Sequence, residues 1–188
     1  QSRHNEDQNI NLYREAEAKV KTEPAFDYLL GKRYLDEKKF DLAYTEFGEG
    51  LEKARKADVP SPLISLNLAQ MALVNGRPEH AVEVLEEAKK QRPDWASIRS
   101  LLWPAYLAVG NSVAADQALQ EAYELDRRPK LAITGSPDHP VRLTTANGSL
   151  RLVPPTAVSV NPGTMTLNNA AGAIQKFSVE ANQAVLIR

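Results

Sequence analysis

Residues 68–93 read LAQMALVNGRPEHAVEVLEEAKKQRP, and small and large apolar residues stand at fixed positions within this stretch. Those positions are held by Leu68, Ala69, Ala72, Gly76, Ala81, Leu85, Ala88 and Pro93. A shift of 34 residues towards the C-terminus places the same pattern on Leu102, Trp103, Tyr106, Gly110, Ala115, Leu119 and Ala122. A shift of 38 residues the other way places it on Leu30, Gly31, Tyr34, Ala43, Phe47 and Gly50. Self-similarity at such a period predicts an array of helical repeats.

The three copies resemble the tetratricopeptide repeat between Pro24 and about Arg128. The resemblance implies that each repeat is a pair of antiparallel helices and that the pairs stack into an α-solenoid. It further implies that the first helices of the repeats line a concave surface, here called the groove, which holds another polypeptide. Since paired helices must cross closely, small residues are expected at the crossing, and Ala43, Ala81 and Ala115 occupy that position.

The third and first repeats depart from the pattern. Trp103 stands where the other repeats have a small residue, so we expect its side chain to push the helices apart or to turn outward. Lys38 occupies the position at which Gly76 and Gly110 end the first helix of their repeats. A left-handed backbone costs glycine little, so we expect the turn at Lys38 to close differently. Pro104 removes a helical hydrogen bond and is expected to kink its helix.

Length and composition indicate an ordinary soluble protein with a sizeable core. The chain has 188 residues, 43% of them hydrophobic and 25% charged. Residues 130–188 carry five basic and two acidic residues, a net charge of +3, and the remainder carries 18 and 22, a net charge of −4. Neither value is extreme enough to predict binding to nucleic acid or a membrane. The drop in charge density after Pro129 marks a domain boundary.

The absence of cysteine excludes disulfides and thiol chemistry within this sequence. No apolar run approaches the roughly 18 residues of a membrane-spanning helix. The sequence begins at Gln1 rather than methionine, so we interpret it as a processed form or a cut fragment, which a signal or lipid anchor could have preceded. This favours a bacterial periplasm or cell envelope over the cytoplasm.

The apolar periodicity predicts six helices in the repeat region. Their expected ranges are Ala25–Glu37, Asp41–Lys56, Pro62–Asn75, Pro78–Gln91, Trp95–Val109 and Val113–Asp126. Repeats are thus expected at about residues 24–60, 62–95 and 96–129. A further helix is expected over residues 10–22, either as the second helix of another repeat or as an N-terminal cap. Ser61 and Asn111 or Ser112 are expected helix N-caps.

After Pro129 the period changes from 3.6 to 2. Val141–Thr145 and Ser149–Val153 flank Ala146-Asn147-Gly148, which predicts a β-hairpin. Further strands are expected at Leu131–Ile133, Ala157–Val160, Thr164–Leu167, Lys176–Val179 and Ala184–Ile187. The fold class is therefore α+β, with a helical domain over residues 1–129 and a small antiparallel β domain, a sandwich or roll, over residues 130–188. This β domain resembles no family that we identify.

The sequence indicates no catalytic, cofactor or metal site. His4, His80 and His139 are far apart, and no two of them have metal-ligand spacing. The segment Ser136–Pro140 contains a serine, an aspartate and a histidine, but neighbouring residues do not assemble a triad, and a linker turn is the better interpretation. We therefore expect a protein that is not an enzyme.

The resemblance assigns particular residues to the groove. They are Tyr28 and Lys32 in the first repeat, Leu63, Leu66, Asn67 and Gln70 in the second, and Ser97, Ser100 and Leu101 in the third. Members of the family that grip a C-terminal carboxylate use cations and asparagines at these positions, and only Asn67 matches. The groove is instead mixed apolar and amide, which suits an extended or helical peptide.

The first hypothesis is a scaffold or assembly factor, in a bacterial envelope machine, that binds a polypeptide segment in the groove. The alternative is a structural subunit whose β domain makes the main contact while the repeats act as a spacer. The last repeat also needs a cap, because a solenoid repeat cannot bury its outer face alone. We expect Leu131 and Ile133 to dock on the third repeat, so that the β domain is this cap.

Overall fold

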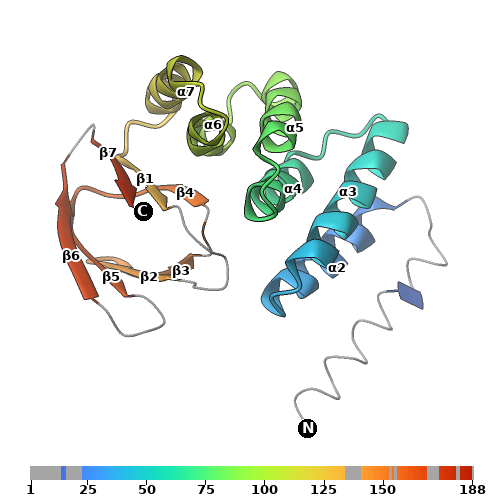
Figure 1. Cartoon of the computed structure of the whole chain (residues 1–188), viewed down its shortest axis with the longest axis horizontal. Helices are drawn as coiled ribbons and strands as arrows, with labels where there is room; N and C mark the ends of the chain where they lie inside the picture. Colours follow the sequence, from blue (N-terminus) through green and yellow to red (C-terminus); the bar gives the residue numbers. More distant parts are fainter. Residues whose placement is uncertain are drawn as a thin grey trace, which may run out of the picture.

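The computed structural model describes residues 14–15, 23–133, 141–152, 154, 156–168, 174–180 and 183–187. Within residues 23–133 six helices form three pairs, and each helix contacts the next along the chain (Figure 1). The helices are α2 (Pro24–Asp36), α3 (Phe40–Lys56), α4 (Pro62–Val74), α5 (Pro78–Gln91), α6 (Ala96–Ala108) and α7 (Ser112–Leu125). Every boundary lies within one residue of its predicted position. The predicted helix over residues 10–22 lies outside the described residues apart from Arg14 and Glu15.

The helix starts follow from local chemistry. Pro24, Pro62 and Pro78 begin α2, α4 and α5, where a missing N–H breaks no helical hydrogen bond. Asn111 caps α7, because its Oδ1 accepts a hydrogen bond from the Ala114 N–H at 3.1 Å, as predicted. Ser61 precedes α4 but does not cap it through its side chain, since its hydroxyl donates to the carbonyl of Val59.

Close helix crossings hold each pair together. Ala43, Ala81 and Ala115 are fully buried, as the crossing positions require. The closest approach is at Gly31 of α2, where an added Cβ would lie 2.6 Å from Cε1 of the buried Phe47 ring in α3. The absence of a side chain at residue 31 is therefore what lets the first two helices meet.

The turn at Lys38 closes in the same way as the glycine turns, so the expectation of a different closure is wrong. Lys38 has a φ of 60°, close to the 65° of Gly76 and the 76° of Gly110. The N–H of Lys39 donates to the carbonyl of Tyr34 at 2.8 Å, which is the same closing bond that Arg77 and Asn111 make in the other two turns. Lys38 thus adopts a strained left-handed conformation, and the turn keeps the same geometry as the two glycine turns.

Seven strands follow the helices and form two small sheets. The strands are β1 (Lys130–Ile133), β2 (Val141–Thr145), β3 (Gly148–Leu152), β4 (Thr156–Ser159), β5 (Gly163–Asn168), β6 (Ile174–Val179) and β7 (Ala184–Ile187). One sheet has the order β4-β1-β7 and the other has the order β3-β2-β5-β6. The expectation of an antiparallel β domain is wrong for one pair, because β1 runs parallel to β7. Their facing side chains share one apolar cluster, which includes Leu131, Leu143, Met165 and Val179.

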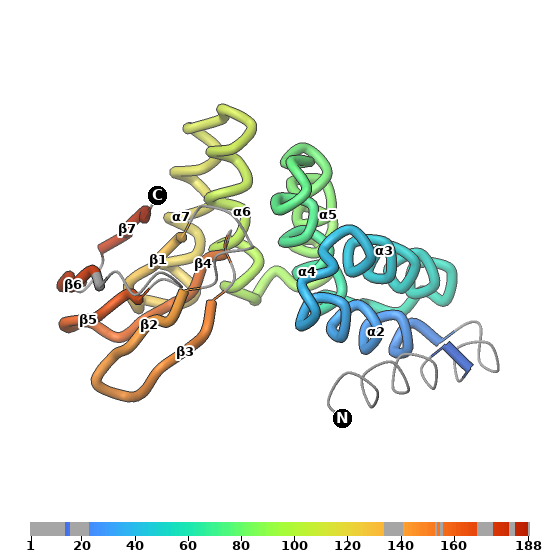
Figure 2. The backbone as a smooth tube through the Cα atoms, turned by 60° about the horizontal axis from the view of Figure 1, so that its bottom comes forward, coloured from blue at the N-terminus to red at the C-terminus, as the bar shows by residue number. Residues whose placement is uncertain are grey.

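The three-stranded sheet packs against the last helix pair (Figure 2). Ala132 of β1 clusters with Trp103 of α6 and Ala115 of α7, and the neighbouring strands add side chains to the same cluster. Those side chains are Ala157, Ala184 and Leu186. Trp103 thus turns outward, which is one of its two expected outcomes. Its side chain packs against the three-stranded sheet.

The β domain therefore covers the last repeat, but through different residues from those expected. Leu131 and Ile133 point to the other side of β1, into the core between the two sheets, and Ala132 faces the helices. Side chains alternate along a strand, so only one of the two sets can face the helices. The smaller alanine lets the sheet approach the large Trp103, while the two larger residues fill the β core.

A buried lysine fixes the connection between α7 and β1. Lys130 is 0% exposed, and its Nζ donates to the carbonyls of Asp126 and Arg128 at 2.5 Å each. The ammonium also lies 4.8 Å from the centre of the Tyr123 ring. Burial lowers the pKa of Lys130. These contacts satisfy the carbonyls of two residues that follow the last turn of α7.

Candidate polypeptide-binding surface

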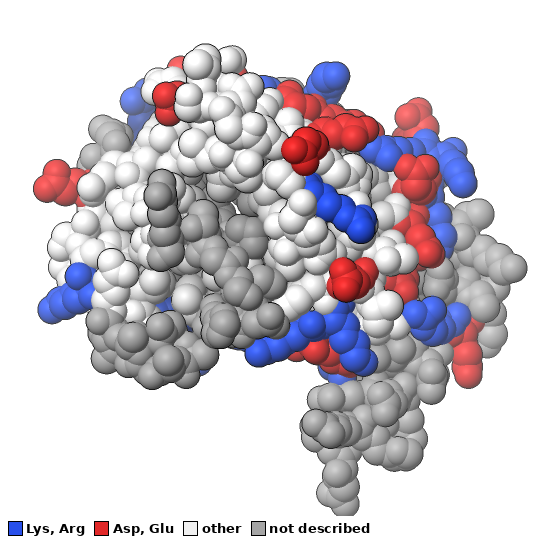
Figure 3. Space-filling model, viewed as in Figure 1, with Lys and Arg blue, Asp and Glu red and all other residues white. Residues whose placement is uncertain are grey.

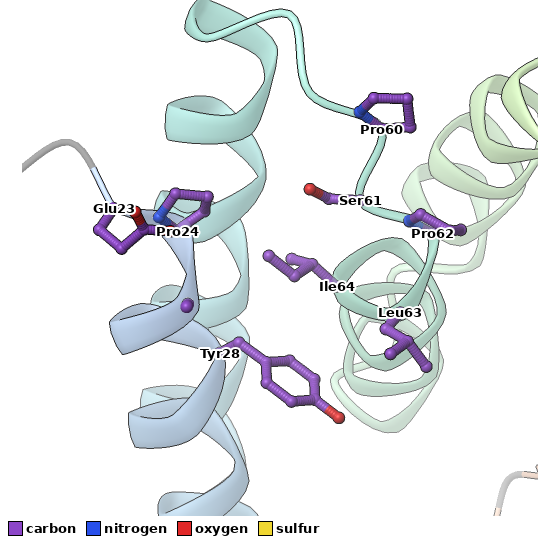
Figure 4. A pocket seen from close by; sticks show the side chains of 9 residues that line it. Glu23, Pro24, Tyr28, Pro60, Ser61, Pro62, Leu63 and Ile64 are labelled. Carbon is purple, nitrogen blue, oxygen red and sulfur yellow. The ribbon is translucent and has the colours of Figure 1, made fainter.

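An apolar pocket lies between the starts of α2 and α4 (Figure 4). Its volume is about 280 Å³, and its lining consists of Glu23, Pro24, Ala25, Tyr28, Pro60, Ser61, Pro62, Leu63 and Ile64. The Tyr28 ring comes from α2 and the Leu63 side chain from the first turn of α4. The structure thus brings together two predicted groove residues from different repeats.

Exposure makes this pocket available to a ligand. Leu63 borders the pocket and is 53% exposed. Tyr28 is half-buried and packs against Phe47 with a ring-centre distance of 6.1 Å, which holds its orientation. Three prolines line the pocket, so its wall carries few backbone N–H groups. The pocket therefore suits an apolar side chain.

The remaining predicted residues of the first two repeats are half-buried. They are Lys32, Leu66, Asn67 and Gln70. Leu66 packs against the helical core. The Asn67 amide donates to the carbonyl of Leu63 at 2.8 Å, so it is engaged with its own helix in this structure. A partner's backbone would have to compete with that bond or use the amide oxygen.

The third repeat contributes less to the groove than the resemblance implied. Ser97 is exposed, but Ser100 is only 2% exposed and its hydroxyl donates to the carbonyl of Ala96 at 2.9 Å. Leu101 is 7% exposed and belongs to the helical core. β4 contacts α6, so the β domain stands against this part of the array. We expected the β domain to cap the third repeat, but the groove residues were assigned from the resemblance alone, which takes no account of a β domain.

Charged side chains are concentrated on the part of the molecule that also contains the pocket. In Figure 3 they crowd over the half of the molecule that contains α2 to α5 and are sparse over α6 and α7. Arg55 of α3 pairs with Glu87 of α5 and with Glu52 of its own helix. The hydrogen bond from Arg55 lowers the pKa of Glu87. This ion pair ties the first two repeats together away from the pocket.

Glu121 of α7 is the corresponding acceptor for the last two repeats. Lys89 of α5 and Arg99 of α6 pair with its Oε2 at 3.3 and 3.0 Å. Burial favours the neutral form of Glu121, but its hydrogen bonds with Gln117 and these two cations hold its pKa below the ordinary value. This network could not be predicted from the sequence, because a charged helix face shows the same pattern whether or not its side chains have partners.

Three carboxylates meet where α2 and α3 face each other. Asp27, Glu46 and Glu49 offer oxygen atoms that all lie within 4.8 Å of one another. Lys53 pairs with Asp27 at 2.8 Å, and Arg14 pairs with Glu46 at 3.1 Å. Cations of the chain thus already balance two of these acids, so the arrangement is that of an ion-pair network.

Of the three histidines, only His80 lies within the residues that the structure describes. His80 accepts or donates a hydrogen bond with the Tyr44 hydroxyl at 2.8 Å, while His4, His139 and the Ser136–Pro140 segment lie outside the described residues. None of the described helices is long and apolar enough to span a membrane.

The fold is similar to solved structures of MamA. The crystal structure of MamA matches with a TM-score of 0.59 and 16% identity, over 66% of this chain and 71% of that one. MamA from Desulfovibrio magneticus RS-1, residues 41 to the end, matches with a TM-score of 0.57 and 22% identity, over 66% and 68%. The MSR-1 MamA structure gives 0.54 and 21%, over 64% and 67%. No family model and no curated protein matches the sequence. The likeness assigns the helical part a TPR-like fold.

Proposed function

We propose that this protein is a non-enzymatic interaction scaffold that holds a polypeptide segment in the groove, with an apolar side chain of that segment in the pocket between α2 and α4. The observation that carries the proposal is the exposed Leu63 opposite Tyr28 at this pocket. Fully burying one apolar side chain contributes about 1.5–3 kcal/mol, enough to anchor an otherwise weak peptide. The TPR-like fold, shared with MamA, supports a protein partner.

The β domain sets the length of the site in this proposal. Ser100 and Leu101 are buried, so the partner contacts mainly the first two repeats, through Tyr28, Lys32 and Leu63. We take residues 1–129 as the binding domain and residues 130–188 as a small sandwich that closes one end of the array. A role as an assembly factor in a bacterial envelope complex is part of the same proposal.

A selection from a random dodecapeptide library tests the proposal. We expect the enriched peptides to share one apolar anchor residue and to bind the parent in a fluorescence anisotropy titration. Leu63→Asp should abolish this binding, because a carboxylate at the pocket opposes burial of an apolar side chain. Leu42→Asp, which changes a leucine of similar exposure on α3, should leave it unchanged.

Two results would contradict the proposal. The first is that no peptide is enriched, and the second is that the enriched peptides bind the Leu63→Asp variant as tightly as the parent. Either outcome would favour the alternative function, a structural subunit whose β domain makes the main contact. The four-stranded sheet offers a specific reason to keep this alternative, since its outward face is basic.

A further inference from the structure

The outward face of the β3-β2-β5-β6 sheet carries basic and hydroxyl side chains. The strand registers and the inward-facing cluster place these residues outward: Arg142, Thr144, Ser149, Arg151, Thr164, Thr166, Asn168, Lys176 and Ser178. No acidic residue stands at an outward position of these four strands, and Glu180 follows the end of β6 at the opposite corner from Arg142 and Arg151. We call this surface, defined by Arg142, Arg151 and Lys176, the basic face.

The two arginines stand directly opposite each other. Arg142 of β2 is the cross-strand partner of Arg151 of β3, and both are exposed. Neither forms an ion pair with any residue that the structure describes. Like charges directly opposite in a sheet are destabilising, so the fold alone gives no reason for this pair. An anion that lies between the two guanidinium groups would offset the repulsion.

Lys176 extends the basic face across the sheet. It lies on β6, two strands from β2. Lys176 pairs with Thr166, and Thr166 pairs with Thr144, which lies two residues after Arg142 on β2. Lys176 is therefore one row of outward side chains away from the arginine pair. At about 4.8 Å between strands and about 6.7 Å between rows, its Cα is roughly 12–16 Å from those of the arginines. Residues i and i+4 of an extended segment are separated by roughly 13 Å. The spacing therefore matches carboxylates on one side of an extended chain.

We propose that the basic face binds an acidic, extended polypeptide segment of a partner protein, at a surface distinct from the groove. The arginine pair offers planar forks that fit carboxylates, and the surrounding hydroxyls supply further donors. The outward positions of the four strands include no aromatic residue on which bases could stack. This absence favours a polypeptide over a single-stranded nucleic acid.

A titration with a fluorescein-labelled dodecapeptide of alternating glutamate and threonine tests this proposal on the full chain. We expect binding that weakens between 50 and 200 mM salt, because exposed charges are screened. Arg142→Gln and Arg151→Gln should each raise Kd roughly two- to tenfold. Lys90→Gln, which removes one exposed cation from α5, should leave Kd unchanged. Leu63→Asp should also bind as the parent does, which separates this site from the groove.

Arg151→Glu separates a binding role from a structural one. The new carboxylate would face Arg142 across the strands, so Tm should rise by about 1–4 °C while the acidic peptide no longer binds. A parent that does not bind the peptide would overturn the proposal. So would a Kd that rises equally in the Lys90→Gln control, since net charge alone would then explain binding. Tighter binding of single-stranded DNA or of vesicles with anionic lipid, through the same arginines, would replace the polypeptide with that ligand.

Discussion

The first and third repeats have different residues at the same position of the helix pair. In the first repeat Gly31 gives the Phe47 ring room to lie against the helix backbone, and the groove beside it stays open at Tyr28 and Leu63. In the third repeat Trp103 takes the equivalent position and packs against Ala132 of the β domain. The comparison shows that one exchange of a small residue for a large one accompanies the change from an open face to one that the β domain covers.

The physical reason lies in what each residue can bury. A glycine at the crossing leaves the partner helix to fill the space, so the pair is complete without further elements. A tryptophan cannot be covered by one neighbouring helix, and its indole needs apolar contacts beyond its own repeat. The three-stranded sheet supplies those contacts, and the terminal repeat thereby acquires the cap that a solenoid requires.

The largest change in stability is expected from truncation of Trp103, the residue that packs against the β domain in the third repeat. Trp103→Ala should lower the free energy of unfolding by about 3–5 kcal/mol, because it removes a buried indole shared by the helices and the sheet. Leu107→Ala, which truncates a partly exposed leucine in the same helix, should cost much less. Urea unfolding followed by circular dichroism measures both. Equal costs for the two variants would show that the sheet does not depend on Trp103.

At the open end, Gly31→Ala should destabilise the protein by about 1–3 kcal/mol, because the new Cβ overlaps the fixed Phe47 ring. Gly48→Ala is the matched control, since it also lies within a helix but no atom stands within 4 Å of its added Cβ. This control should gain up to about 1 kcal/mol through helix propensity. Thermal unfolding of both variants gives the comparison, and two changes of the same sign would contradict the close crossing.

The sequence predicted the helices and strands well because their signals are local. Proline at helix starts, the repeated small residues and the change of period after Pro129 each depend on nearby residues alone. The contact between the β domain and the third repeat was predicted, but the residues of β1 that make this contact were not. Alternation showed that β1 has two faces, but the choice between Leu131 and Ala132 for the helical side depended on the size of Trp103 and on the needs of the second sheet.

The candidate site was predicted only in part for a related reason. Tyr28 and Leu63 do line one pocket, since both come from the two repeats that remain open. In the covered repeat Ser100, the counterpart of Tyr28, is buried, and so is Leu101, whereas Ser97, the counterpart of Leu63, remains exposed. A family resemblance assigns residues to faces of an array, but it contains no information on a β domain that lies against one of those faces.

The junction between α7 and β1 should weaken in acid. Asp126 accepts hydrogen bonds from the Arg128 side chain and backbone, which hold its pKa well below the ordinary value. A depressed carboxyl pKa stabilises the fold above the unfolded-state value of about 3.9, and this contribution disappears as the pH falls through the native pKa. We expect Asp126→Asn to lose about 1 kcal/mol at pH 7 and to show a smaller further loss than the parent below pH 4.

Asp94 provides the control for this junction. It forms a similar fork with Arg92 between α5 and α6, in an exposed turn. Asp94→Asn should therefore leave both the stability at pH 7 and its dependence on pH close to those of the parent. Urea midpoints at pH 7, 4 and 3 distinguish the two sites. A parent-like acid profile for Asp126→Asn would mean that the junction does not depend on this carboxylate.

The smallest effect is expected at the turns that close the helix pairs, where the first repeat again differs from the others. Lys38 holds the left-handed conformation that Gly76 holds in the second repeat, with the same closing hydrogen bonds. That conformation costs a residue with a Cβ roughly 1–2 kcal/mol. A glycine avoids this cost, but it gives the unfolded chain more conformational entropy, which lowers stability. Lys38→Gly should therefore raise the free energy of unfolding by only about 0.5–1 kcal/mol.

The reciprocal Gly76→Lys should lower the free energy of unfolding by about the same amount, because the second turn then has the strain that the first has now. Opposite shifts in the urea midpoint would show that the two turns are equivalent, while a loss of stability in Lys38→Gly would show that the lysine side chain stabilises the first turn by more than its backbone costs.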